Sequence, residues 1–234
     1  MSKTPPPTAD YSAVGRAIAW VITPIYIALF FGILLVFHPL QVIAHRISYR
    51  AHMFILNLMN LCLITNFRLT GAQISFEHCG DLPVDRPLLI VSNHQSMYDI
   101  PLIIWAFRKH HPKFVAKKEL GRGIPSISFA LRHMGSVLID RDNADQALAA
   151  IKQFGAALAQ RKFSACIFPE GTRGRQGQMR PFRVAGFAAL LESMPGAIVV
   201  PVVISGSWEL VRYNLLPVPL GVKVRLRQLP QQDP

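Results

Sequence analysis

The hydrophobic residues of this chain follow one pattern before residue 65 and another after it. The first part holds two continuous apolar runs, Ala17–Leu40 and Met53–Thr65. In the second part, short apolar stretches alternate with longer segments whose apolar residues recur at helical spacing. We therefore expect an N-terminal tail with membrane-associated helices in residues 1–65 and an α/β domain in residues 66–234.

The first apolar run, of 24 residues, is long enough to cross a bilayer, which takes about 20. It is too long for a cleavable signal peptide, and no small-residue cleavage site follows it. The second run has 13 residues and contains Asn57 and Asn60, which is typical of a re-entrant or interfacial helix. A single span and a helical hairpin in one leaflet both remain open. We prefer the hairpin because the second run is too short to cross.

After residue 65 the alternation predicts a mostly parallel central sheet covered by helices on both faces. The expected strands are Phe67–Glu77 (a strand pair or bent strand), Leu88–Ser92, Phe114–Ala116, Ser136–Ile139, Ser164–Phe168, Ile198–Ile204 and, at an edge, Val222–Arg227. The expected helices are Ile100–Phe107, Ser126–Met134, Ala144–Gln160 and Val184–Glu192. Pro201 favours an edge position or a bulge for its strand. Pro5–Pro7 and Gln231–Pro234 are expected to be disordered ends.

Composition narrows the class of protein. Hydrophobic residues make up 51% of the chain and the mean hydropathy is +0.30, yet the formal net charge is +12. This combination indicates contact with an anionic membrane surface or with phosphate groups. The basic residues are scattered and no nucleic-acid-binding motif accompanies them, so we expect no nucleic-acid partner. The three cysteines have no metal-ligand or disulfide spacing, which fits a reducing compartment.

The segment NHQSMYD brings a histidine and a carboxylate together directly after the buried strand Leu88–Ser92. Open α/β sheets place their chemistry at such strand ends. A carboxylate on one ring nitrogen holds the imidazole in one tautomer and stabilises its protonated form. His94 and Asp99 are therefore a candidate general base for an alcohol or water nucleophile. The alternative is a loop histidine beside a helix N-cap aspartate.

A second candidate element, FPEGTR, follows the strand Ser164–Phe168. Gly171 allows close approach of the backbone, Thr172 offers a hydroxyl, and the guanidinium of Arg173 can bind a phosphate as a planar fork. More positive charge follows at Arg175, Arg180 and Arg183. The alternative is a surface loop with a structural contact between Glu170 and Arg173.

Weaker elements follow three other strands. GSVLIDR places Asp140 beside Arg141, and Lys117 and Lys118 follow the strand Phe114–Ala116. Either lysine could face a substrate, although two adjacent lysines are also typical of a solvated turn. For VPVVISG a purely structural role is at least as plausible. No spacing typical of metal ligands is present, so we expect no metal site.

In this order, NHQSMYD, GSVLIDR, FPEGTR and VPVVISG resemble the four sequence blocks of the glycerolipid acyltransferases, and most nearly the bacterial 1-acyl-sn-glycerol-3-phosphate acyltransferases. The resemblance covers residues 70–227, and the apolar N-terminus fits the membrane-anchoring region of that family. The first and third blocks are specific and the other two are permissive. The sequence ends soon after Arg227, so we expect C-terminal elements of longer relatives to be missing.

The resemblance implies transfer of a fatty acyl group from a thioester of acyl-carrier protein or coenzyme A to the sn-2 hydroxyl of lysophosphatidic acid, with no other cofactor. His94 and Asp99 match the catalytic dyad of the family. The residues matched to acceptor or phosphate binding are Glu170, Gly171, Thr172, Arg173, Arg141 and Lys117. The implied location is the bacterial cytoplasmic (inner) membrane, with the catalytic domain facing the cytoplasm and its anionic lipid surface.

Three alternatives stay open. The same chemistry could act on another lyso-lipid, such as lyso-ornithine lipid. Ser96 could form a triad with His94 and Asp99 and act as a hydrolase or thioesterase through an acyl-enzyme, but the G-x-S-x-G elbow is missing. The chain could also be a non-enzymatic tether, which would leave the His/Asp pair and the Pro-Glu-Gly-Thr-Arg turn unexplained.

Overall fold

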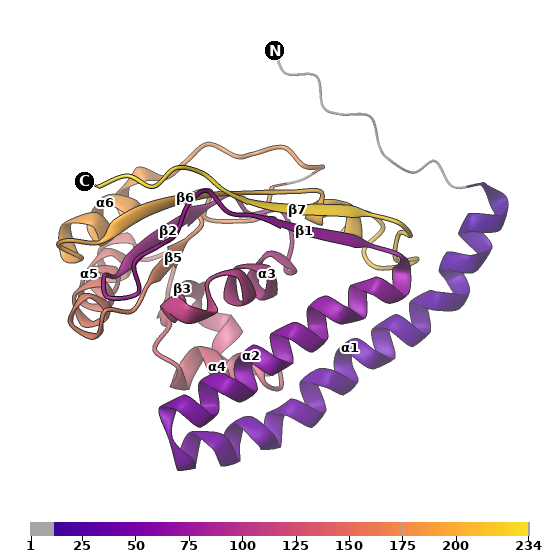
Figure 1. Cartoon of the computed structure of the whole chain (residues 1–234), viewed down its shortest axis with the longest axis horizontal. Helices are drawn as coiled ribbons and strands as arrows, with labels where there is room; N and C mark the ends of the chain where they lie inside the picture. The colour runs from indigo at the N-terminus through magenta and orange to yellow at the C-terminus, as the bar shows by residue number, and fades with distance from the viewer. Residues whose placement is uncertain (1–11, 175, 234) are drawn as a thin grey trace.

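Two long helices form an antiparallel hairpin that lies beside the rest of the molecule (Figure 1). The computed structural model describes residues 12–174 and 176–233, so the expectations for Pro5–Pro7, Arg175 and Pro234 fall outside it. Helix α1 spans Ala13–Ile47 and α2 spans Tyr49–Asn66. Serine hydroxyls cap both helices: Ser12 Oγ accepts from the amide of Gly15 at 3.2 Å, and Ser48 Oγ from the amide of Ala51 at 3.0 Å.

The two helices of the hairpin differ in exposure. The most apolar 18-residue window of α1 is 22% buried, whereas that of α2 is 50% buried. With the following 3₁₀ turn η1 (Phe67–Thr70), the second helix extends over Tyr49–Thr70. Both helices are therefore long and apolar enough to cross a membrane, and the argument that the second run is too short was wrong because polar residues extend the helix at both ends.

The described residues form a seven-stranded sheet in the order β1–β7–β6–β2–β5–β3–β4. The strands are β1 (Gln73–Glu77), β2 (Leu88–Ser92), β3 (Lys113–Lys117), β4 (Val137–Ile139), β5 (Ala165–Ile167), β6 (Ile198–Ser205) and β7 (Lys223–Gln228). All neighbours pair in parallel except β6 and β7, which are antiparallel. The predicted fold class, a mostly parallel sheet with an N-terminal helical hairpin, is confirmed.

Two expectations about strands were wrong. The segment Phe67–Glu77 divides into η1 and β1, and β7 lies between β1 and β6 rather than at an edge. Pro201 lies in β6, an inner strand, so of the two expected positions it has the bulge and not the edge: Val202 pairs with Gln228 but Val199 pairs with Gln232, which leaves one extra residue opposite Pro201. The proline fits because antiparallel pairing with β7 begins only at Val202, while the carbonyl of Pro201 still accepts from the amide of Leu229 at 2.9 Å.

Helices cover both faces of the sheet (Figure 1). The remaining helices are α3 (Asp99–Ala106), α4 (Ile127–His133), α5 (Ala144–Arg161) and α6 (Val184–Ser193), with 3₁₀ turns η2 (Arg108–His110), η3 (Lys118–Gly121) and η4 (Ser207–Val211). Because side chains alternate along a strand, β2 serves two cores. Leu88 and Ile90 pack in the cluster that includes α3 and the hairpin, and Leu89 packs in the cluster that includes α5 and α6.

This topology brings the candidate segments to one edge. Strands β2, β5, β3, β4 and β6 run in the same direction. Their carboxyl ends therefore meet at one edge of the sheet, the place where α/β proteins bind ligands. The segments carrying His94, Glu170, Lys117 and Arg141 all follow these ends.

Candidate active site

His94 and Asp99 form a hydrogen-bonded pair. His94 Nδ1 lies 2.8 Å from Asp99 Oδ2, and the carboxylate is fully buried whereas the imidazole is 15% exposed. Asp99 Oδ2 also accepts from the backbone amides of Gln95 at 2.7 Å and Ser96 at 2.9 Å. Asp99 thus holds the loop at the start of α3 and contacts the histidine at the same time. The alternative of a helix N-cap aspartate was wrong, because Tyr98 is the N-cap of α3 and Asp99 is its first residue.

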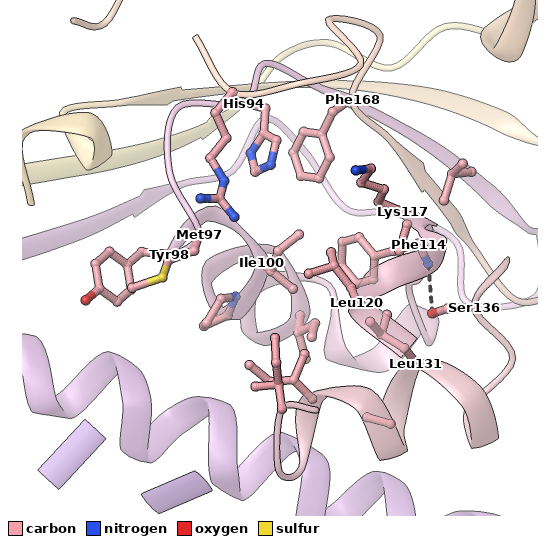
Figure 2. Close-up of a pocket in the computed structure, with 18 of the residues that line it drawn as sticks. His94, Met97, Tyr98, Ile100, Phe114, Lys117, Leu120, Leu131, Ser136 and Phe168 are labelled. Carbon is pink, nitrogen blue, oxygen red and sulfur yellow. Dashed lines mark hydrogen bonds between the residues drawn. The ribbon is translucent and has the colours of Figure 1, made fainter. Parts of the chain in front are cut away.

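The imidazole of His94 faces a cavity. Its ring stacks on Phe168, with centroids 4.1 Å apart and planes 19° from parallel. Figure 2 shows His94, Phe168 and Lys117 around one end of this cavity, with Ile100, Leu120 and Leu131 farther in. Because a carboxylate accepts the proton of Nδ1, Nε2 carries the lone pair that a substrate can meet.

Glu170 is almost fully buried at 2% exposure and holds two loops. Its Oε1 accepts from the amide of His94 at 2.7 Å, and its Oε2 accepts from the amide of Arg180 at 2.8 Å. Within residues 12–174 and 176–233 no ion pair joins Glu170 to Arg173, so the alternative of a structural Glu170–Arg173 contact is wrong. The carboxylate binds amides because its side chain points inward, under the turn.

The turn after β5 is tied to the loop after β2. The amide of Gly174 donates to the carbonyl of His94 at 2.7 Å, and the amide of Gly171 to the carbonyl of Phe168 at 2.9 Å. Gly171 has φ +68°, a left-handed conformation that favours glycine. A Cβ at this position would lie 3.4 Å from Cδ of Arg183, so the Arg183 side chain passes directly over the turn.

Five Lys and Arg residues line the same cavity as His94: the buried Lys113, and Lys117, Arg141, Arg173 and Arg183. Burial lowers the pKa of Arg141 from its usual value, and the nearby charges of Arg183 and Arg173 lower it further, against the opposing effect of Glu119. Lys117 Nζ lies 3.3 Å from a carboxylate oxygen of Glu119. Thr172 is exposed and is not among the lining residues. The sequence signalled Arg183 only as additional charge.

The whole cavity has a volume of about 770 Å³, and its remaining lining is mainly apolar. Its walls come from α1, α2, α3 and α4, and include Phe30, Leu34, Met59, Ile104 and Met134. The imidazole of His94 therefore lies between a cluster of positive charge and a space suited to a long hydrocarbon chain.

Ser96 does not face His94. It is fully buried, its Oγ accepts from the amide of Tyr98 at 3.2 Å, and it lies 3.4 Å from Asp99 Oδ1. These contacts hold the loop and disfavour the acyl-enzyme alternative. Within the described ranges no cluster of three or more His, Cys, Asp or Glu residues suited to a metal ion was found.

Two further side chains hold the segments of the site together, and the sequence did not predict these roles. Asn93 bridges β2 to β6, donating to the carbonyl of Ile204 at 2.8 Å and accepting from its amide at 2.7 Å. Ser207 Oγ lies 2.5 Å from Asp99 Oδ1. Both contacts join residues more than 100 positions apart, so local patterns could not reveal them.

The chain is similar in sequence to curated 1-acyl-sn-glycerol-3-phosphate acyltransferases. A 1-acyl-sn-glycerol-3-phosphate acyltransferase of Cocos nucifera is 34% identical over 145 residues, which cover 58% of this chain and 44% of the relative. One from Helicobacter pylori is 36% identical over 118 residues, covering 50% and 47%. The chain thus spans about half the length of these curated relatives.

A solved structure shows the same fold. The crystal structure of the 1-acyl-sn-glycerophosphate acyltransferase PlsC from Thermotoga maritima aligns with a TM-score of 0.73 at 23% identity, covering 93% of this chain and 87% of that one. A family model described as Acyltransferase matches residues 73–205, which is more than half of the chain and contains the His94–Asp99 pair and the Glu170 turn. The chain belongs to the acyltransferase family.

Proposed function

We propose that this protein transfers a fatty acyl group from an acyl thioester to the sn-2 hydroxyl of lysophosphatidic acid, giving phosphatidic acid. The observation that carries the proposal is the position of His94, between three guanidinium groups and an apolar cavity. The names of the relatives support the same activity.

The reaction needs one base and no covalent enzyme intermediate. His94 Nε2 takes the proton of the acceptor hydroxyl while the oxygen attacks the thioester carbonyl; a C–O bond forms and the C–S bond breaks. The leaving thiolate then receives the proton from His94. Asp99 fixes the tautomer and stabilises the imidazolium that forms between these steps.

Arg141, Arg173 and Arg183 would hold the acceptor phosphate, because guanidinium groups bind phosphate through paired N–H donors. Lys117 lines the same region and adds positive charge. Glu170 serves the site indirectly, since both of its carboxylate oxygens accept backbone amides. The acyl chain would occupy the apolar cavity, and the thioester of acyl-carrier protein or coenzyme A is the co-substrate, with no other cofactor.

We propose that the hairpin lies in the cytoplasmic leaflet of the membrane. Its first helix, α1, contacts the α/β domain at two separate places: the Tyr26 hydroxyl donates to that of Tyr98 at 2.7 Å, and the centre of the His45 ring, near the turn, lies 4.9 Å from that of His133 in α4. A turn on the far side of the bilayer could not reach α4. Exposed apolar residues of α1, such as Val21 and Val36, would face lipid.

The test is an assay of purified protein with acyl-carrier protein and coenzyme A thioesters and a panel of lyso-lipids, with products resolved by mass. We expect phosphatidic acid from lysophosphatidic acid. His94→Ala should lose about 10²- to 10⁴-fold in rate, the usual contribution of a positioned base, with an unchanged thermal unfolding curve. Product from lyso-ornithine lipid alone would contradict the acceptor, and release of free fatty acid without a new ester would favour a hydrolase.

A further inference from the structure

We propose that Ser207 is a positioning residue of the acyl transfer, acting on the catalytic base through Asp99. The proposal rests on the function proposed above. Ser207 is the first residue of η4, directly after the fourth sequence block, and its side chain is fully buried. For the fourth block a structural role was at least as plausible from the sequence. The residue that follows this block places its hydroxyl against the His94–Asp99 pair.

The two oxygens of Asp99 have separate sets of donors. Oδ2 faces His94 Nδ1 and the amides of Gln95 and Ser96, at 2.7 to 2.9 Å. Oδ1 receives the hydroxyl of Ser207 at 2.5 Å, and the hydroxyl of Ser96 lies farther away at 3.4 Å. Ser207 therefore provides the main hydrogen bond to Oδ1 and, by fixing that oxygen, fixes the direction in which Oδ2 points.

A carboxylate with no solvent exposure needs such donors. Burial of a charge without hydrogen bonds is costly, and Asp99 makes no ion pair other than that with His94 within residues 12–174 and 176–233. When His94 is neutral, as it must be to act as a base, the negative charge is balanced only by hydrogen-bond donors. Ser207 contributes one of these in the reactive state.

The backbone around Ser207 is fixed independently of the dyad. Gly206 has φ +82°, and a Cβ there would collide with the carbonyl of Lys223, so this left-handed turn accepts only glycine without rearrangement. The side chain of Asn93 clamps Ile204 on both its amide and its carbonyl. The Asn93 bridge therefore ties the strand before His94 to the strand before Ser207.

The experiment compares Ser207→Ala with Ser205→Ala, a matched change two residues earlier at an exposed position of β6. We expect Ser207→Ala to lower kcat about 10- to 100-fold, the scale of a hydrogen bond to a charged group, with an unchanged acceptor KM. On the acidic side of the pH–rate profile, the activity of Ser207→Ala should begin to fall at a higher pH than that of wild type. A carboxylate that has lost a donor binds the proton of the pair more tightly, whichever partner carries it.

One further variant and one spectroscopic measurement make the test decisive. Ser207→Cys, which keeps the size and a weak donor, should fall between wild type and Ser207→Ala, and all variants should have the wild-type unfolding midpoint within a few degrees. An unchanged kcat and pH–rate profile in a folded Ser207→Ala, or an equal loss in Ser205→Ala, would overturn the proposal.

The proton NMR signal of His94 Nδ1–H is a readout that does not depend on substrate. We expect it to move downfield in Ser207→Ala, because the freed carboxylate accepts more strongly, and to stay in place in Ser205→Ala. If wild type acylates none of the lyso-lipids, the proposed function fails while this signal still tests Ser207. A signal that does not move would contradict the positioning role whatever the activity.

Discussion

Arg183 is held where its side chain crosses the proposed phosphate-binding region. Its amide donates to the carbonyl of Pro169 at 2.8 Å, and its side chain lies over Gly171. We expect Arg183→Gln to raise the KM for lysophosphatidic acid about 10- to 100-fold, because it removes a charged hydrogen bond to phosphate. The KM for the thioester should be unchanged.

The measurement is steady-state kinetics with each substrate varied in turn. Arg122→Gln is the control. It removes the same charge, but Arg122 is exposed and does not line the cavity. Arg183→Lys should recover part of the affinity, since an amine keeps the charge but lacks the planar fork. An equal effect of Arg122→Gln would mean that general charge, rather than Arg183, attracts the acceptor.

The site residues differ in how far the sequence could predict them. His94 and Asp99 are five positions apart, so one segment displays the pair, and the structure joins them at 2.8 Å. Glu170 was expected at the phosphate, but the direction of a side chain in a turn depends on what lies beneath it. For Glu170 that is the amide of His94, 76 positions away in sequence.

At the scale of elements, Lys113 joins β3 to the hairpin. It is 2% exposed, and its Nζ lies 3.6 Å from Met53 Sδ and 5.2 Å from the Tyr49 ring centre. Burial, and to a smaller extent the positive charge of Arg161, lowers the pKa of Lys113 from 10.5 to about 7. Below its folded pKa the lysine must be charged in an apolar setting, which weakens the contact between the two elements.

The unfolded chain binds this proton up to pH 10.5, whereas the folded chain releases it near pH 7, so the Lys113 contribution should raise stability as the pH rises through that interval. We expect Lys113→Met to unfold at a higher temperature than wild type at pH 7, with the difference shrinking toward pH 10. Thermal unfolding across this range measures it, with Lys109→Met, at an exposed position, as control. A pH-independent difference would contradict the argument.

Element positions were predictable where the pattern is local. Each expected element between residues 88 and 228 is present with its ends within one residue of the expectation. The place of each strand in the sheet was not predictable in the same way. Lys223–Gln228 alternates between exposed and buried residues as an edge strand would, yet β1 pairs beside it and covers its outer edge. Hydrophobic alternation reports one solvated face of the sheet, not the neighbours within it.

At the scale of the whole molecule, the hairpin and the edge of the sheet that carries His94 form one assembly. Tyr98 lies one position before Asp99, and its ring packs edge-on against Phe67 with centroids 4.6 Å apart, while its hydroxyl accepts from Tyr26. Thr23 accepts from the amide of Val218 at 2.8 Å, which adds a second tie to α1. Under the proposed function, the acceptor would enter the cavity from the lipid, because the cavity walls include the hairpin itself.

This arrangement predicts that the turn of the hairpin and the sheet domain lie on the same side of the membrane. The turn carries Arg46 and Arg50, and positive residues next to apolar segments favour the cytoplasmic side. Cys79 is exposed on the sheet domain and reports the side on which that domain lies. The experiment compares sealed right-side-out vesicles with sealed inside-out vesicles. We expect an impermeant maleimide to label Cys79 and the position changed by Arg46→Cys in vesicles of the same orientation.

The variants separate a turn on the side of the sheet domain from a hairpin whose two helices both cross the bilayer, because these two arrangements give opposite labelling patterns. If both helices crossed the bilayer, Arg46→Cys would be labelled only in the orientation in which Cys79 is protected. Arg50→Cys, on the other side of the turn, should repeat the result of Arg46→Cys, and detergent-solubilised protein sets the full extent of labelling. Cys166 is fully buried and adds no background in folded protein, whereas Cys62 is only partly buried, so Arg46→Cys in a chain that also carries Cys62→Ser and Cys79→Ser isolates the turn signal. Labelling of the turn from the side opposite to Cys79 would place α4 and His45 across the bilayer from each other, which their packing forbids.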